Sequence, residues 1–150
     1  MKCWTPHPFH RRALELHDER DGLGRGKVLG QLGLVAYERF KEARTANKPK
    51  AELVRHLNDA EQFYLQALEL TPPNAVDFLA MMHGSLGNIC GDAGDIERSV
   101  EHCREAARYF EAGEDVYLAA QTRFNVAVTL AQAGAAGGRA GVCARGSAEL

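Results

Sequence analysis

The stretch from His83 to Ala107 constrains the fold most, because it is typical of a helix, a tight turn and a second helix. Gly94 can adopt the left-handed conformation that ends a helix, and Asp95 can cap the next one. Gly87 would let a neighbouring helix approach closely. Apolar residues recur at three- and four-residue spacing and so share one helix face: Leu79, Met82, Leu86, Ile89 and Cys90. The pattern predicts two helices packed side by side.

This stretch resembles a tetratricopeptide repeat, whose pattern is W-x2-L-G-x2-Y, then A-x3-F, then P. Leu86 and Gly87 match the Leu-Gly pair, whereas Ser99 and Cys103 stand at the positions of the Ala and the Phe. The comparison therefore depends on further copies in the chain.

Two further signals repeat the pattern at an earlier point of the chain. Leu32-Gly33 repeats the first half, and Ala60-x3-Tyr64 repeats the second half. Ala60 and Ser99 are 39 residues apart, and the Ala-Gly pairs at 93–94 and 133–134 are 40 apart. A period of this size is typical of repeat architectures.

The resemblance implies an all-α fold, a right-handed α-solenoid of antiparallel helix pairs with about three repeats over residues 9–133. We expect helices over 9–17, 27–46, 51–70, 75–93, 95–112 and 116–133. In the last of these, the residues predicted to face inward are Tyr117, Ala120, Phe124, Ala127 and Leu130.

Both ends of the chain are predicted to lie outside the repeats. Residues 1–8 contain Pro6 and Pro8 and are expected to be flexible. Residues 134–150 contain five glycines, which cost about 4–5 kcal/mol of helix propensity, so we expect a poorly ordered tail. Read one base later with suitable codons, residues 135–150 can encode R-R-E-D-A-L-A-Y-A-R-A-A-L-R-N. One hypothesis is therefore that the chain is a piece of a longer array with a shifted reading frame.

Composition and charge exclude several classes of protein. The net charge of −2 and the pI of about 6.3 provide no basic field for nucleic acid. No apolar run approaches the length of a membrane helix, and residues 1–10 lack the apolar core of a signal peptide. The four cysteines show no C-x2-C spacing. These features predict a cytoplasmic protein with reduced thiols that contacts neither membrane nor nucleic acid.

Three groups of residues resemble chemical sites, and each has a simpler interpretation. His83, Cys90, His102 and Cys103 could converge on a metal, but cysteines in a repeat pattern more often pack as small apolar residues. Cys103 follows His102 directly, so the two side chains do not face each other as a nucleophile and its base. The glycines at 22, 24 and 26 lie in an expected polar turn over 18–27, and their spacing does not fit a phosphate-binding loop. The sequence thus predicts no catalytic residue, no metal and no cofactor.

The concave face of the array is the predicted binding surface, since stacked helix pairs bind ligands there. The helix register places these residues in the peptide groove: Leu34, Tyr37, Glu38, Gly84, Asn88, Gly91, Asp92, Gln121, Phe124, Asn125, Val128 and Gln132. Some tetratricopeptide proteins grip a C-terminal carboxylate in this groove, and here only Asn88, with Arg123 nearby, suits that mode. Asn88 and Asn125 could instead bond a ligand's backbone amides, or they could bond neighbouring helices.

The resemblance implies a non-catalytic scaffold that binds a protein or peptide, as a peptide or helix in the groove. In bacteria such arrays often belong to regulatory or signalling proteins. The alternative function is self-assembly into a homodimer through an uncapped end of the array, which would leave Ala120, Phe124 and Leu130 to be covered by a second copy. A metal-binding protein is a further alternative.

Overall fold

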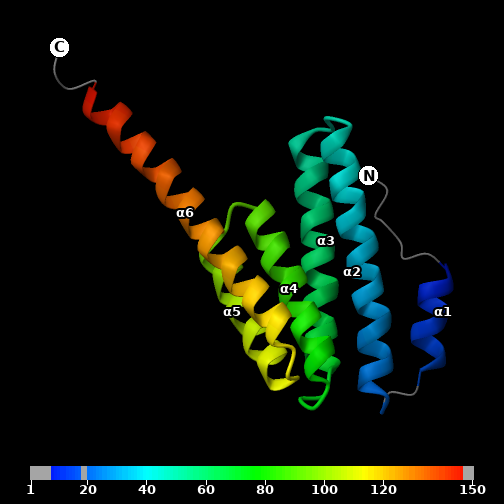
Figure 1. Cartoon of the computed structure of the whole chain (residues 1–150). Coiled ribbons are helices and arrows are strands. Elements are labelled where there is room, and N and C mark those ends of the chain that lie inside the picture. The colour runs from blue at the N-terminus through cyan, green and yellow to red at the C-terminus, as the bar shows by residue number, and fades with distance from the viewer. Residues whose placement is uncertain (1–7, 18–19, 147–150) are drawn as a thin grey trace.

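The computed structural model describes residues 8–17 and 20–146, and within these ranges it contains six α-helices and no strand (Figure 1). The predicted all-α class is therefore confirmed. The helices are α1 (Pro8–Leu16), α2 (Gly22–Thr45), α3 (Lys50–Leu70), α4 (Val76–Asp92), α5 (Ile96–Ala112) and α6 (Val116–Gly146). The predicted flexible segment 1–8 lies outside the described residues except for Pro8, which begins α1. Among the described helices, none combines the length and the apolar character that crossing a membrane requires.

The helices form a row in which each packs against the next along the chain (Figure 1). Helix α1 lies on the outer side of α2, and α6 packs on α5 by its first turns before it extends past the other helices. The contact between α2 and α3 and that between α4 and α5 are the most extensive, and α3 and α4 contact less. The row therefore has two closely packed helix pairs at its centre.

Small residues mark the contact within the α2–α3 pair. Leu32 and Ala60 are fully buried, and Tyr64 is 2% exposed. A Cβ atom added at Gly33 would lie 2.9 Å from ring carbons of Tyr64, so the ring packs directly on the glycine backbone. The residues of the two sequence signals, Leu32-Gly33 and Ala60-x3-Tyr64, are thus buried at this contact.

The α4–α5 pair uses the equivalent positions. A Cβ atom at Gly87 would collide with Sγ of Cys103 and would lie 3.3 Å from the carbonyl oxygen of Ser99. The Ser99 hydroxyl donates a hydrogen bond of 2.7 Å to the carbonyl oxygen of Gly87. The predicted close approach at Gly87 is confirmed. An alanine at position 99 could not form the hydrogen bond that the buried Ser99 hydroxyl donates.

The turn predicted at Gly94 and the cap predicted at Asp95 lie where the sequence places them. Gly94 has φ +84°, and the carboxylate of Asp95 accepts a bond of 3.1 Å from the N–H of Arg98. Asp115 accepts a bond of 3.0 Å from the N–H of Leu118 at the start of α6. Glu114, with φ +63°, takes the left-handed position between α5 and α6.

The predicted start of the second helix was wrong, because α2 begins at Gly22 and not at Lys27. Asp21 caps it by accepting a bond of 2.8 Å from the N–H of Gly24. A Cβ atom at Gly26 would lie 2.9 Å from Oγ1 of Thr71, so the lack of side chains lets the end of α3 approach closely. That contact offsets the low helix propensity of glycine, which alone predicts a turn.

The predicted inward face of α6 was also wrong. Ala119 is 1% exposed and is buried against the row, whereas Tyr117 is 75% and Phe124 is 68% exposed. Ala120 and Ala127 are exposed, and Leu130 is 45% exposed. Apolar residues occur all round this helix, so spacing alone does not select the buried stripe.

The sequence predicts that the last helix ends at Ala133, but α6 continues to Gly146. The stretch contains four alanines among its glycines, and no proline interrupts it. The expected poor order of 134–150 stays a prediction, and residues 147–150 lie outside the described ranges.

Candidate functional site

A surface cleft of about 490 Å³ lies where α2, α4, α5 and α6 come together. Helix α4 contributes Asn88, Gly91 and Asp92 on one side, and α6 contributes Asn125 and Gln132 on the other. Tyr37 of α2 lies at one end. We call this the amide cleft, and its remaining lining comes from Gly87, Gly94, Ile96, Ser99, Cys103, Thr129, Ala133 and Ala136.

Six of the twelve predicted groove residues line the amide cleft: Tyr37, Asn88, Gly91, Asp92, Asn125 and Gln132. The other six lie on the surface outside it. Leu34, Phe124 and Val128 are 43%, 68% and 37% exposed, and Gly84 has no atom within 4 Å of an added Cβ. Glu38 accepts a bond from Lys41, and Gln121 is exposed on α6.

The register of α6 bears on the predicted groove residues of that helix. Asn125, Thr129, Gln132 and Ala136 follow at four- and three-residue spacing and share the cleft-facing side. Phe124 and Val128 belong to the neighbouring stripe, whereas Gln121 lies one turn before Asn125 on the cleft-facing side and is not part of the lining. Sequence reasoning missed Thr129 and Ala136 because it placed the wrong stripe of α6 in the groove.

The side-chain amides of the cleft have no protein partner among the described residues. Asn88, Asn125 and Gln132 are exposed, and none of the three side chains forms a hydrogen bond with a described residue. This geometry argues against the simpler interpretation, in which Asn88 and Asn125 bond neighbouring helices. Each amide keeps donors and an acceptor available for a ligand.

One end of the amide cleft is fixed by a charged cluster. The hydroxyl of Tyr37 donates a bond of 2.6 Å to Asp92, and Arg44 donates one of 3.0 Å to the same carboxylate. Burial, and then the bond to Asp92, raise the pKa of Tyr37 well above its ordinary value of 10.0. The phenol therefore stays protonated and holds α2 against α4, and Arg44 compensates the charge of Asp92.

Arg123 does not lie at the amide cleft, where the sequence places it near Asn88. It pairs with Glu111 and lines a different surface pocket, between α5 and α6. No lysine or arginine side chain lines the cleft within the described residues. The cleft therefore lacks the cation that recognition of a terminal carboxylate would use.

The histidines of the candidate metal site meet each other between α4 and α5. Nδ1 of His83 and Nδ1 of His102 are 3.1 Å apart, and the His83 ring stacks on Tyr109 at 5.6 Å. Burial lowers the pKa of both imidazoles. Among the described residues, no three His, Cys, Asp or Glu side chains are grouped so that they could hold a metal ion.

The two cysteines of that candidate site pack between the helices. Cys90 is 2% exposed, and Cys103 covers Gly87. Burial raises the pKa of both thiols above the ordinary value. A protonated, enclosed thiol is a poor nucleophile and a poor metal ligand, which favours the packing interpretation of these residues.

Comparisons with known proteins add no relative: no protein-family model, no curated protein and no solved structure matches the chain.

Proposed function

We propose that the chain is a non-catalytic interaction module that binds an extended peptide or a helix in the amide cleft. The observation that carries this proposal is the set of exposed, unpartnered amides on opposite sides of one cleft, Asn88 on α4 and Asn125 on α6. Side-chain amides can bond the N–H and C=O groups of a ligand backbone, which is recognition that tolerates many sequences. The bound partner is a protein or peptide, and the setting is the cytoplasm.

The fold that we propose for this module is a right-handed solenoid of antiparallel helix pairs, similar to a tetratricopeptide array. Contacts within the first pair run in opposite order along the chain, which supports the antiparallel arrangement. Gly22 of α2 lies at Leu70 of α3, and Gly33 lies at Tyr64. Gly33 contacts Tyr64, four residues after Ala60, and Gly87 contacts Cys103, four residues after Ser99. The same spacing in both helix pairs supports the repeat.

The amide cleft suits a neutral ligand segment better than a charged one. Asp92 is its only charged lining residue among those described, and Arg44 already pairs with that carboxylate. Ile96 and the alanines of α6 supply apolar contact beside the amides. We therefore expect a ligand with small apolar side chains and an accessible backbone.

Affinity capture with matched variants tests the proposal. The wild-type chain, Asn88→Arg and Asn125→Arg are used as baits in a lysate of the source organism, and retained proteins are identified by mass spectrometry. Gln121→Arg is the control, because it adds the same charge to α6 outside the cleft. A protein retained by the wild type and the control, and lost with both cleft variants, supports the proposal. Equal retention by all four baits contradicts it.

Self-association is a second candidate function, favoured by the uncovered side of α6. Val116, Tyr117 and Phe124 are 72%, 75% and 68% exposed, which leaves a large apolar face to water. Large exposed apolar side chains that lie together often mark interaction sites. A second copy of the chain could cover such a face without using the amide cleft.

A further inference from the structure

The outer face of α5 carries four charged side chains in one stripe. Glu97, Glu101, Arg104 and Arg108 follow at four-, three- and four-residue spacing, so they share one side of the helix. All four are exposed. The first two are acidic and the last two are basic, so the stripe is neutral as a whole and divided into an acidic and a basic half. We call it the α5 stripe.

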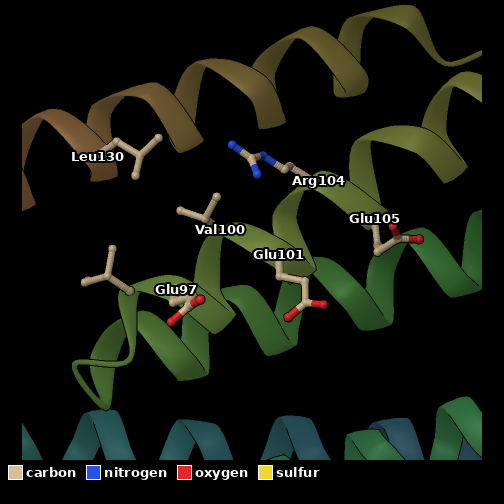
Figure 2. A pocket seen from close by; sticks show the side chains of 7 residues that line it. Glu97, Val100, Glu101, Arg104, Glu105 and Leu130 are labelled. Carbon is tan, nitrogen blue, oxygen red and sulfur yellow. The ribbon is translucent and has the colours of Figure 1, made fainter.

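Two surface pockets lie along this stripe, between α5 and α6. The first is about 680 Å³ and is lined by Glu97, Glu101, Arg104 and Leu130, among others. Figure 2 shows its glutamates on one edge of α5 and Arg104 on the edge nearer α6, with Leu130 above Val100. The second pocket is about 460 Å³ and contains Arg104 and Arg108 over a mostly apolar floor. The first pocket is therefore mainly acidic, with Glu97, Glu101 and Glu105 beside Arg104, and the second is basic, with Arg104, Arg108 and Arg123.

The arrangement of the four charges has two-fold symmetry with opposite signs. Glu97 and Arg108 lie equally far from the midpoint between residues 102 and 103, and so do Glu101 and Arg104. When two copies of α5 lie antiparallel across a two-fold axis at that midpoint, each glutamate meets an arginine of the other copy. A two-fold interface uses one surface patch twice and needs this kind of self-complementarity.

We propose that two copies of this chain form a two-fold dimer through the α5 stripe and the neighbouring surface of α6. Glu97 pairs with Arg108 of the second copy, and Glu101 pairs with its Arg104. The inference gives self-association a specific interface on α5, which is distinct from the exposed side of α6 that carries Val116, Tyr117 and Phe124. None of the four residues of the α5 stripe lines the amide cleft.

Charge complementarity selects a second copy over other occupants. An acidic partner helix would meet Glu97 and Glu101, and a basic one would meet Arg104 and Arg108. Exposed ion pairs contribute little affinity, but they fix register and exclude wrong partners. The affinity comes from apolar contact, for which Leu130, 45% exposed, lies beside the stripe. Arg108 now bonds Glu105 at 2.8 Å and keeps further guanidinium donors for a second carboxylate.

Charge-reversal variants of the full chain test the dimer by sedimentation equilibrium. Variant one is Glu97→Arg/Glu101→Arg, and variant two is Arg104→Glu/Arg108→Glu. Each makes the stripe single-signed, so each homodimer dissociates with a constant raised more than about tenfold, since like charges meet at every position. An equimolar mixture of the two variants restores every opposite pair and therefore restores the dimer.

The controls separate a fold defect from a lost interface. Glu42→Arg/Glu69→Arg reverses two exposed charges on α2 and α3 and leaves the dimer intact. The helical circular dichroism of every variant equals that of the wild type, because the changed residues are exposed. The expected wild-type result is a mass that rises with concentration from 16.4 kDa towards twice that value.

Two results would overturn the dimer. One is a wild-type mass of 16.4 kDa at every concentration. The other is a dimer that both single-signed variants form as well as the wild type does. Neither result bears on peptide capture by the amide cleft, so the two proposals fail independently.

Discussion

The central helices and the last helix differ in how many of their apolar residues are buried. Helices α2 to α5 bury most of their apolar positions, with Leu32 and Leu86 fully enclosed. In α6, only Ala119 is buried among residues 116–136, while its aromatic residues face water. The comparison indicates that the two central pairs supply the stability, and that α6 supplies surface: one wall of the amide cleft and an uncovered apolar side.

Truncation of a large apolar side chain should distinguish the two regions most strongly. We expect Leu86→Ala to lower the free energy of unfolding by about 2–5 kcal/mol, because it leaves a cavity at a fully buried position. Phe124→Ala, at an exposed position of α6, should change it by less than about 0.5 kcal/mol. Urea denaturation followed by circular dichroism measures both. A loss for Phe124→Ala equal to that for Leu86→Ala would contradict the difference between the regions.

Two glycines of α4 give a sharper comparison inside the central pair. Gly87→Ala should destabilise by about 1–3 kcal/mol, because the new methyl group meets Cys103 and the carbonyl of Ser99. Gly84→Ala should stabilise by up to about 1 kcal/mol, since the position is open and alanine favours the helix. Thermal unfolding of the two variants reports the sign of each effect. A stabilised Gly87→Ala variant would show that the helices do not touch there.

The two capping aspartates should differ in the extent of unfolding that their loss produces. Asp95→Ala removes the cap of α5, which packs on both α4 and α6, and should cost about 1 kcal/mol of global stability. Asp115→Ala removes the cap of α6, and its loss should be local. Hydrogen exchange should show faster exchange confined to the first turns of α6. Protection lost throughout α2 to α5 in Asp115→Ala would contradict this prediction.

The smallest expected effect depends on pH and arises between α4 and α5. Folding lowers the pKa of His83 and His102 below 6.5, mainly through burial. Below pH 6.5 the unfolded chain therefore binds more protons than the folded chain. The contribution of the two neutral histidines to the free energy of unfolding is complete above pH 6.5, and it is lost as the pH falls through their pKa values in the folded chain. Glu105 faces both rings and opposes the shifts, as Glu101 and Glu61 do at His102, while Arg98 reinforces the shift there.

The pH prediction is measured as a difference between the wild type and His102→Gln. Urea midpoints at pH 7.5 and pH 5 should fall more for the wild type than for the variant, because the variant has lost one of the two titrating rings. An equal fall in both proteins would show that the carboxylates, which the two chains share, account for the whole dependence.

The sequence predicts the central helices well because their burial follows a simple spacing. The Leu-Gly signals at 32–33 and 86–87, and the cap at Asp95, each have one local interpretation, and the structure places them accordingly. The start of α2 was missed because the contact of Gly26 with the end of α3 is tertiary. Local propensity contains no information about such a contact.

Two predicted groove residues of α6, Phe124 and Val128, were misplaced for a related reason. Helix α6 has apolar residues on every side, so the buried stripe depends on which side α5 meets. Because Tyr117 and Phe124 were predicted to face inward, the predicted groove side of α6 differs from the side that lines the cleft. Of the groove residues predicted on α6, only Asn125 and Gln132 line the cleft. On α4, where one face is clearly apolar, Asn88, Gly91 and Asp92 were placed together.

The most direct test of the peptide-binding claim is an NMR titration with a peptide segment of a captured partner. The side-chain NH₂ signals of Asn88 and Asn125 are followed as the peptide is added, with those of Asn58 and Gln62 on α3 as internal controls. The account predicts that the two cleft amides shift together and saturate at one peptide per cleft, while the controls stay in place. Saturable shifts that are confined to the outer side of α5 and α6, with Asn88 and Asn125 unmoved, would contradict it.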